Sequence, residues 1–137
     1  MARILAIDYG TKRCGIAVTD PLQMIATGLT TVHSKDIIDW LKKYMEKESV
    51  ETIVVGDPKN LRGEKTDASE HADGFVTSLK RNFPGMKIAR VDERFTSKMA
   101  TKAILDSGMK KKDRQDKALV DEVSATIMLQ SYLEQKH

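Results

Sequence analysis

Apolar and polar positions in the first part of the chain fall into three short segments with the character of β-strands. Arg3–Asp8 is a short apolar run of the length expected for a buried strand. Cys14–Asp20 and Gly28–His33 follow it, and the turns before them contain Gly10 and Pro21. Because short turns join the three segments, we expect them to form an antiparallel meander.

Beyond His33 the apolar positions change to helical spacing. In Asp36–Lys47 they recur every three or four residues, as on one face of an amphipathic helix, and Ser34 is a candidate N-cap. Strands are predicted again over Glu51–Val55 and Lys87–Val91. Further helices are predicted over Ala68–Asn82, Ser97–Ser107 and Lys117–Gln135.

The predicted order of elements is β-β-β-α-β-α-β-α-α. It indicates an α/β fold with a mixed five-stranded sheet, in which three antiparallel strands come first and parallel strands are added through helical crossovers. This layout is of the ribonuclease-H-like type, with helices flanking the sheet. The chain has 137 residues, close to the commonest size of one domain, so we expect a single domain over residues 1–137.

Composition narrows the class of protein and its location. Apolar residues make up 40% of the chain and charged residues 31%, which is typical of a globular domain and excludes a disordered tail. No apolar run approaches the roughly 20 residues that span a bilayer, and the N-terminus lacks the pattern of a signal peptide. Cys14 is the only cysteine, and the three histidines are too far apart in sequence for a zinc site. We therefore expect a cytoplasmic protein with no membrane partner.

One segment accounts for the net charge of +3. Residues 107–117 read SGMKKKDRQDK, with five basic and two acidic side chains. One interpretation is a patch that faces phosphate groups, and the other is a solvated loop. The side chains that would contact phosphate are Lys110, Lys111, Lys112 and Arg114.

Asp8 stands at the end of the first predicted strand. Open α/β sheets usually bind ligands at the carboxyl edge of their strands, so Asp8 is a candidate metal ligand. Lys12 and Arg13 lie on the turn that follows and could hold a substrate phosphate near that metal. The alternative is an aspartate that accepts backbone hydrogen bonds in a tight turn.

Asp92 and Glu93 follow the last predicted strand in the same way. If the extended backbone continues, their side chains point to opposite faces of the sheet, and only one of them can join Asp8. Arg94 and Thr96 would add a charged group and a hydroxyl for substrate binding. An ordinary polar loop before the next helix is the alternative.

A third acidic position lies inside the last predicted helix. Asp121 lies on the same face of this helix as the apolar residues Ala125 and Met128. A carboxylate on such a face lowers the stability of the fold unless it is paired with a positive charge or bound to a metal. On this basis, Asp121→Asn is expected to leave the metal-free fold at least as stable as the wild type. Glu122 heads a similar stripe, so periodicity does not choose between the two acids.

The chain resembles the YqgF/RuvX family of Holliday-junction-resolvase-like proteins in four segments that cover it nearly end to end: IDYGTKRCGIAVTD, IVVGDPKNLRGE, VDERFTS and LVDEVSATIMLQSYL. The resemblance implies a ribonuclease-H-like nuclease that processes the 5′ end of pre-16S rRNA in ribosome biogenesis. Transferred residue by residue, the family pattern makes Asp8, Glu93 and Asp121 the catalytic carboxylates, in preference to Asp92 and Glu122.

Asp57 departs from the family pattern, which usually has an apolar residue between the glycine and proline at this point. More distant ribonuclease-H-like nucleases often place a catalytic acid at the end of this strand. Asp57 is therefore a candidate auxiliary metal ligand, although a turn aspartate before Pro58 is the favoured interpretation.

A carboxylate cluster suits phosphodiester hydrolysis with Mg²⁺ or Mn²⁺, because hard cations prefer oxygen ligands and bring positive charge to the scissile phosphate. The expected partner is nucleic acid, with pre-rRNA favoured and branched DNA as the alternative, and the protein is expected to be a monomer or homodimer. A Holliday-junction resolvase and a non-catalytic RNA-binding assembly factor are the competing functions. A phosphotransferase of the actin or sugar-kinase type needs two lobes, and this chain has room for one.

Overall fold

The computed structural model describes residues 2–58, 62, 64, 66–92 and 117–136. Its strands are β1 (Arg3–Tyr9), β2 (Arg13–Thr19), β3 (Ala26–His33), β4 (Val50–Asp57) and β5 (Lys87–Asp92). Its helices are the short 3-10 helix η1 (Ser34–Asp36) and the α-helices α1 (Ile37–Lys47), α2 (Asp67–Asn82) and α5 (Lys117–Lys136). The predicted helix over Ser97–Ser107 lies outside the described residues.

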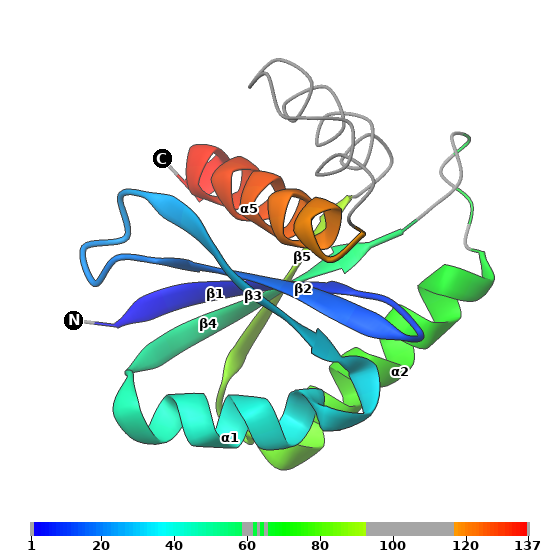
Figure 1. The fold of residues 1–137 in the computed structure, drawn as a ribbon, viewed down its shortest axis with the longest axis horizontal. Helices are drawn as coiled ribbons and strands as arrows, with labels where there is room; N and C mark the ends of the chain where they lie inside the picture. The colour runs from blue at the N-terminus through cyan, green and yellow to red at the C-terminus, as the bar shows by residue number, and fades with distance from the viewer. Residues whose placement is uncertain (1, 59–61, 63, 65, 93–116, 137) are drawn as a thin grey trace.

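The strands form one sheet in the order β3-β2-β1-β4-β5 (Figure 1). β2 pairs antiparallel with both β1 and β3, because short turns reverse the chain between these strands. β4 is parallel to both β1 and β5, because α1 and α2 carry the chain back before each new strand. The predicted mixed sheet, with an antiparallel meander first and parallel strands after it, is confirmed.

Helices cover both faces of the sheet, with α1 and α2 on one face and α5 on the other (Figure 1). Side chains of a strand alternate between these faces, so each strand contributes to two separate apolar clusters. The cluster under α1 and α2 is built mainly from large aliphatic residues of the strands: Leu5, Ile7, Ile16, Ile53 and Val55. The cluster under α5 takes Ile4, Ala6, Ala17, Val54 and Val91 from the strands and Ala125, Leu129 and Leu133 from the helix.

The start of α1 differs from the prediction. Ser34 was expected to cap this helix, but the residue in the cap position is Asp36, whose side chain makes no capping bond. The hydroxyl of Ser34 donates instead to the carbonyl oxygen of Gly10, in the turn between β1 and β2. The local capping preference of serine therefore gives way to a contact that ties two distant turns together.

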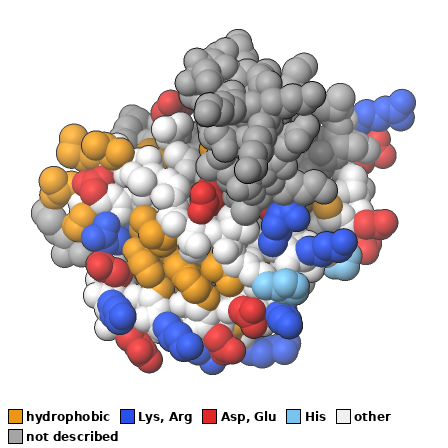
Figure 2. All heavy atoms as spheres, in the orientation of Figure 1, with side chains coloured by type: hydrophobic (Ala, Val, Ile, Leu, Met, Phe, Trp, Pro, Cys, Tyr) orange, Lys and Arg blue, Asp and Glu red, His pale blue; other side chains and the backbone are white. Residues whose placement is uncertain are grey.

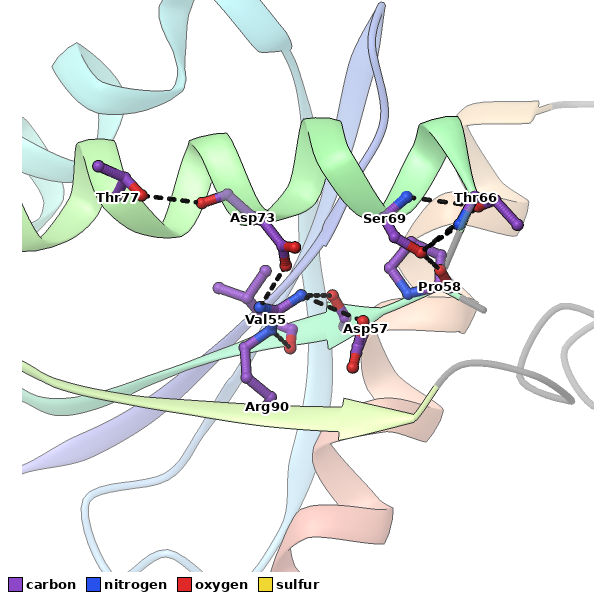
Figure 3. Close-up of polar contacts among 9 residues, drawn as sticks. Val55, Asp57, Pro58, Thr66, Ser69, Asp73, Thr77 and Arg90 are labelled. Carbon is purple, nitrogen blue, oxygen red and sulfur yellow. Dashed lines mark hydrogen bonds and ion pairs between the residues drawn. The ribbon is translucent and has the colours of Figure 1, made fainter. Parts of the chain in front are cut away.

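Helix α2 begins with a complete N-terminal capping box. Thr66 accepts a hydrogen bond from the backbone N–H of Ser69, and the Ser69 hydroxyl accepts one from the N–H of Thr66 at 3.0 Å. The Ser69 hydroxyl also donates to the carbonyl oxygen of Pro58, which fixes the start of α2 next to the end of β4 (Figure 3).

No helix in the described part of the chain is long and apolar enough to cross a membrane.

Candidate active site

Asp8 lies near the end of β1 on the face of the sheet that α5 covers. Ile4 and Ala6 of the same strand are buried in the cluster under α5, and the alternation of side chains puts Asp8 on that face as well. The side chain is not deeply buried, because it lies beyond the last core residues of the strand. The candidate carboxylate is thus held by a rigid strand at the edge of the core.

Gly15 of β2 stands directly opposite Asp8 in the antiparallel ladder. A Cβ atom added to Gly15 would come within 2.9 Å of the Cβ of Asp121 and even closer to the carbonyl oxygen of that residue. Only glycine allows α5 to pass so close to the sheet. Because cross-strand neighbours are about 5 Å apart, the backbone of Asp121 is fixed next to Asp8.

Glu122 occupies a different position above the sheet. Its Cβ lies 3.6 Å from the place where Gly28 of β3 would carry a side chain. β3 is the edge strand, two strands away from β1. The geometry therefore favours Asp121 over Glu122 as the partner of Asp8, a choice that helical periodicity left open.

Asp121 forms an ion pair with Arg13, the first residue of β2. The guanidinium Nε of Arg13 donates to the carboxylate Oδ2 of Asp121, and the two side chains are 37% and 23% exposed. The pairing explains how a carboxylate can precede the buried residues Ala125 and Met128 on one helical stripe.

The turn between β1 and β2 is held in one conformation by backbone contacts. The N–H of Gly10 donates to the carbonyl of Arg13 at 3.0 Å, and a Cβ on Gly10 would lie 2.7 Å from that oxygen. The N–H of Ser34 donates to the carbonyl of Lys12, also at 3.0 Å. Together with the Ser34 hydroxyl, these bonds fasten the turn to η1.

A pocket of about 230 Å³ opens beside this turn and is lined by Gly10, Thr11, Lys12, Arg13 and Asp121. Apolar side chains gather on the side of the molecule that carries the turn between β2 and β3 (Figure 2). The exposed large apolar residues of the described chain belong to the latter turn and to β3: Leu22, Met24, Ile25 and Leu29. The pocket at the end of the sheet that carries Asp8 is thus lined by two basic side chains, Lys12 and Arg13.

Cys14 is adjacent to the site in sequence but belongs to the opposite face. It is fully buried in the cluster under α1 and α2, with its Sγ 3.6 Å from the Ser34 hydroxyl. Burial raises the pKa of the Cys14 thiol, and the negative charges of Asp8 and Asp121 raise it further, against hydrogen bonds with Ser34 and Gly10 that lower it. The thiol therefore stays protonated at neutral pH and is a poor nucleophile or metal ligand.

Asp57 does not join Asp8. It ends β4 on the face of α2, where Arg90 of β5 lies 3.6 Å from its Oδ1 (Figure 3). Arg90 also pairs with Asp73 of α2 at 2.9 Å and donates to the carbonyl oxygens of Val55 and Gly56. Asp57 thus belongs to a network that ties β4, β5 and α2 together, which favours a structural role over that of an auxiliary metal ligand.

Asp92 is directed away from the site as well. It pairs in register with Asp57, and it alternates with Val91, which is buried in the cluster under α5. Its side chain therefore belongs to the face of α2, opposite to the face that carries Asp8. Several candidates lie outside the described residues: Glu93, Arg94, Thr96, Lys110, Lys111, Lys112 and Arg114.

The described part of the site fits a hard divalent cation. Asp8 and Asp121 supply carboxylate oxygens from a strand and a helix on one face, and the nearby thiol is on the other face. Within the described residues there is no group of three histidine, cysteine or acidic side chains close enough to hold a metal. A third protein ligand would have to come from elsewhere in the chain, and Mg²⁺ also accepts water and phosphate oxygens.

Two residues that the sequence reasoning did not select shape this site. Gly15 sets the approach of α5, and Ser34 fixes the turn that carries Lys12 and Arg13. A glycine inside a predicted strand often marks a close approach of another backbone, so the position of Gly15 in a strand indicates such a contact from the sequence alone. The contact of Ser34 with Gly10 joins residues 24 apart and has no local signal.

Comparisons with known proteins agree on the family and on the fold. A family model described as "RuvX: Holliday junction resolvase" matches residues 2–135. A protein of Flavobacterium psychrophilum is 59% identical over 136 residues, which are 99% of each chain. A protein of Phocaeicola vulgatus is 57% identical over 136 residues, 99% of this chain and 98% of its own. Both carry the name "Putative pre-16S rRNA nuclease".

Among solved structures, the chain is similar to RuvC of T. thermophilus in complex with a Holliday junction substrate. The TM-score is 0.60, and the match covers 99% of this chain and 97% of that one. The sequence identity is 16%, so this similarity supports the fold alone.

Proposed function

This chain belongs to the RuvX family of Holliday junction resolvases, and we propose that it is a nuclease that hydrolyses a phosphodiester bond of pre-16S rRNA during ribosome maturation. The name of the relatives, at up to 59% identity over nearly the whole chain, supports the substrate. A role in ribosome maturation implies a cytoplasmic location.

One observation carries the chemical part of the proposal. Gly15 lies opposite Asp8 and lets α5 approach so closely that Asp121 comes next to Asp8. Two carboxylates brought near each other repel, and a bound cation would offset that repulsion. With Glu93 as the third ligand, these acids would hold Mg²⁺ or Mn²⁺.

A divalent ion bound there would supply positive charge at the scissile phosphate and lower the pKa of the attacking water. The residues of the chain perform the remaining tasks. Asp8 and Asp121 fix the position of the cation, because one is held by a strand and the other by a helix packed on that strand. Lys12 and Arg13 line the adjacent pocket and attract the phosphodiester backbone.

Further positive charge would come from residues outside the described part of the chain. Arg94 and Thr96 would contact the substrate next to Glu93, and the segment with Lys110, Lys111, Lys112 and Arg114 would add affinity that does not depend on base sequence. Few aromatic side chains are present, 5% of the sequence, so recognition would rest on backbone shape more than on stacking of bases.

Cleavage of branched DNA is the second candidate function, favoured by the description of the family as Holliday junction resolvases. Both functions use the same carboxylates and cation, and they differ in the shape of the nucleic acid that is bound. A direct comparison of substrates therefore separates them.

The test is cleavage of pre-16S rRNA, a four-way DNA junction and a plain duplex, each in Mg²⁺, Mn²⁺ and EDTA. We expect cleavage of the precursor at its 5′ end, dependent on a divalent ion and stronger than cleavage of either DNA. Asp8→Asn should abolish it, and Asp39→Asn, an exposed acid on α1, is the matched control. Preference for the junction would move the substrate to DNA, and activity of Asp8→Asn within a few-fold of wild type would favour a non-catalytic RNA-binding factor or another site.

A further inference from the structure

Arg13 forms an ion pair with the carboxylate of Asp121, which the proposed function assigns as a metal ligand. Its Nε donates to Oδ2 of Asp121, so a guanidinium lies where the positive charge of a cation is expected. A guanidinium and a divalent cation repel each other and cannot both use the same carboxylate oxygen. A divalent ion that takes Oδ2 of Asp121 therefore has to displace Arg13, and one that takes only Oδ1 has to bind against the charge of the guanidinium.

We propose that Arg13 is a positioning residue with two places: it holds Asp121 in the metal-free protein, and it turns to the substrate phosphate once a divalent ion has taken that carboxylate. This inference rests on the proposed function, because it assumes that Asp121 is a metal ligand. It adds an order of events, in which the ion prepares the phosphate site by releasing Arg13.

The fold allows the side chain of Arg13 to move while its backbone stays fixed. Arg13 pairs with His33 across β2 and β3, and its carbonyl oxygen accepts the hydrogen bond from Gly10. The guanidinium end is different, because the side chain is 37% exposed and borders the 230 Å³ pocket. Only side-chain torsions have to change for Arg13 to leave Asp121 and enter the pocket.

Asp121 cannot follow Arg13. Its backbone is packed against Gly15 with no room for even one additional carbon atom, and the next residues of its stripe are buried. The carboxylate therefore remains next to Asp8 whichever cation it holds. In the metal-free protein Arg13 offsets the repulsion between these two acids, and a bound divalent ion would do the same.

Lys12 provides the matched control for this exchange. It carries the same charge, is the neighbour of Arg13 on the turn, and lines the same pocket, but its side chain is exposed. Removing either charge reduces the general repulsion of a cation. Only the loss of Arg13 also removes the Nε donor to Oδ2 of Asp121, so a difference between the two variants isolates the exchange.

The first experiment measures Mn²⁺ binding by calorimetry without nucleic acid, for wild type, Arg13→Gln, Arg13→Lys and Lys12→Gln. We expect Arg13→Gln to bind Mn²⁺ about fivefold more tightly than wild type, and Lys12→Gln less than twofold more tightly, as for the loss of a partly exposed ion pair. Arg13→Lys should lie between them, because it keeps the charge but loses the donor Nε. Equal affinities of Arg13→Gln and Lys12→Gln would overturn the proposal.

The second experiment measures binding of a short single-stranded RNA in EDTA and in saturating Ca²⁺, a cation that also takes oxygen ligands. Arg13→Gln should weaken RNA binding about fivefold in Ca²⁺ and less than twofold in EDTA, where Asp121 still holds Arg13 in the wild type. Lys12→Gln should weaken it in both conditions. An equal loss for Arg13→Gln with and without Ca²⁺ would show a fixed phosphate contact and contradict the exchange.

These measurements also separate the inference from the function on which it rests. If wild type binds Mn²⁺ and cleaves RNA but Arg13→Gln has unchanged Mn²⁺ affinity, only the exchange fails. If wild type neither binds Mn²⁺ nor cleaves nucleic acid, the proposed function fails together with it.

Discussion

The two faces of the sheet are packed in different ways. Under α1 and α2 the strands present large aliphatic side chains, such as Leu5, Ile7 and Ile53, which fill the space between the sheet and these helices. Under α5 the strands present Ala6 and Ala17 beside larger residues such as Ile4 and Val54, and at Gly15 the helix backbone nearly touches the sheet. The first face supplies stability, and the second brings a carboxylate of the helix to a carboxylate of the strand.

The difference shows what determines the site. Asp8 and Asp121 are separated by more than a hundred residues, and they come together because α5 packs directly against Gly15. Glycine at position 15 and alanine at positions 6 and 17 remove the side chains that would hold it away. The site therefore depends as much on the absence of large side chains at these positions of β1 and β2 as on the acids themselves.

The largest effect on activity is expected for Gly15→Ala. The added methyl group meets the backbone and the Cβ of Asp121, so α5 has to shift, and Asp121 moves away from Asp8. We expect a loss of about 1–3 kcal/mol of unfolding free energy, as for an overpacked core, and a fall in cleavage rate of about a hundredfold or more. Thermal melting and cleavage assays measure the two effects, and a variant that is fully active would show that the close approach is not needed.

A second large effect belongs to the other face. Leu79→Ala removes a fully buried side chain of α2 and should lower the unfolding free energy by about 2–5 kcal/mol. Activity per folded molecule should stay within about twofold of wild type, because the residue is in the cluster opposite the site. Denaturant melts and cleavage at a temperature where the variant is folded check this. A selective loss of activity would mean that the faces are not independent.

A smaller effect is expected for Asp121→Asn in EDTA. The apolar stripe alone suggested that removing this charge would stabilise the metal-free protein. The ion pair with Arg13 reverses that expectation, although partial exposure of both groups keeps the loss to about 1 kcal/mol or less. Melting curves should show a slightly lower Tm than for wild type, and Glu134→Gln, an exposed acid on the same helix, should show no change. A higher Tm for Asp121→Asn would mean that repulsion from the neighbouring acids outweighs the pair.

The smallest effect concerns Asp20, far from the site in the turn between β2 and β3. Its carboxylate accepts hydrogen bonds from the backbone N–H groups of Ile25, Met24 and Leu22, and these bonds lower its pKa. A lowered pKa in the folded state means that the stabilisation is present at neutral pH. It is lost as the pH falls below the usual aspartate value of about 4 toward the folded value.

Asp20→Asn should accordingly have a lower Tm than wild type at pH 7, and the difference should shrink as the pH falls below about 4. Melts over this pH range measure it. A difference that stays constant down to the lowest pH would show that the charge of Asp20 does not contribute.

Much of the fold could be predicted because it depends on the local pattern of apolar and turn residues. The meander, the two later strands and the helices follow from apolar spacing and from turn residues, and all that fall within the described residues are present with small shifts at their ends. Ser34 was assigned wrongly because its partner, Gly10, is distant in sequence. Local preferences can rank a serine as a cap, but they cannot show a tertiary contact that competes for its hydroxyl.

The site was predictable in part. The end of a strand marked Asp8, but the choice of Asp121 over Glu122 depends on the rotation of α5 above β2 and β3, which Gly15 and Gly28 determine from another part of the sequence. The resemblance to the family and the geometry at Gly15 both favour Asp121 over Glu122. Asp57 could not be judged locally either, since its partner Arg90 lies on a neighbouring strand.

The central claim is that Asp8 and Asp121 hold one divalent cation between β1 and α5. A crystal structure of the full chain soaked in Mn²⁺, with anomalous diffraction to locate the metal, tests it most directly. The account predicts an anomalous peak at about 2.0–2.3 Å from a carboxylate oxygen of each residue, with the guanidinium of Arg13 turned away from Asp121. Mn²⁺ bound only elsewhere, with Arg13 still on Asp121, would contradict it.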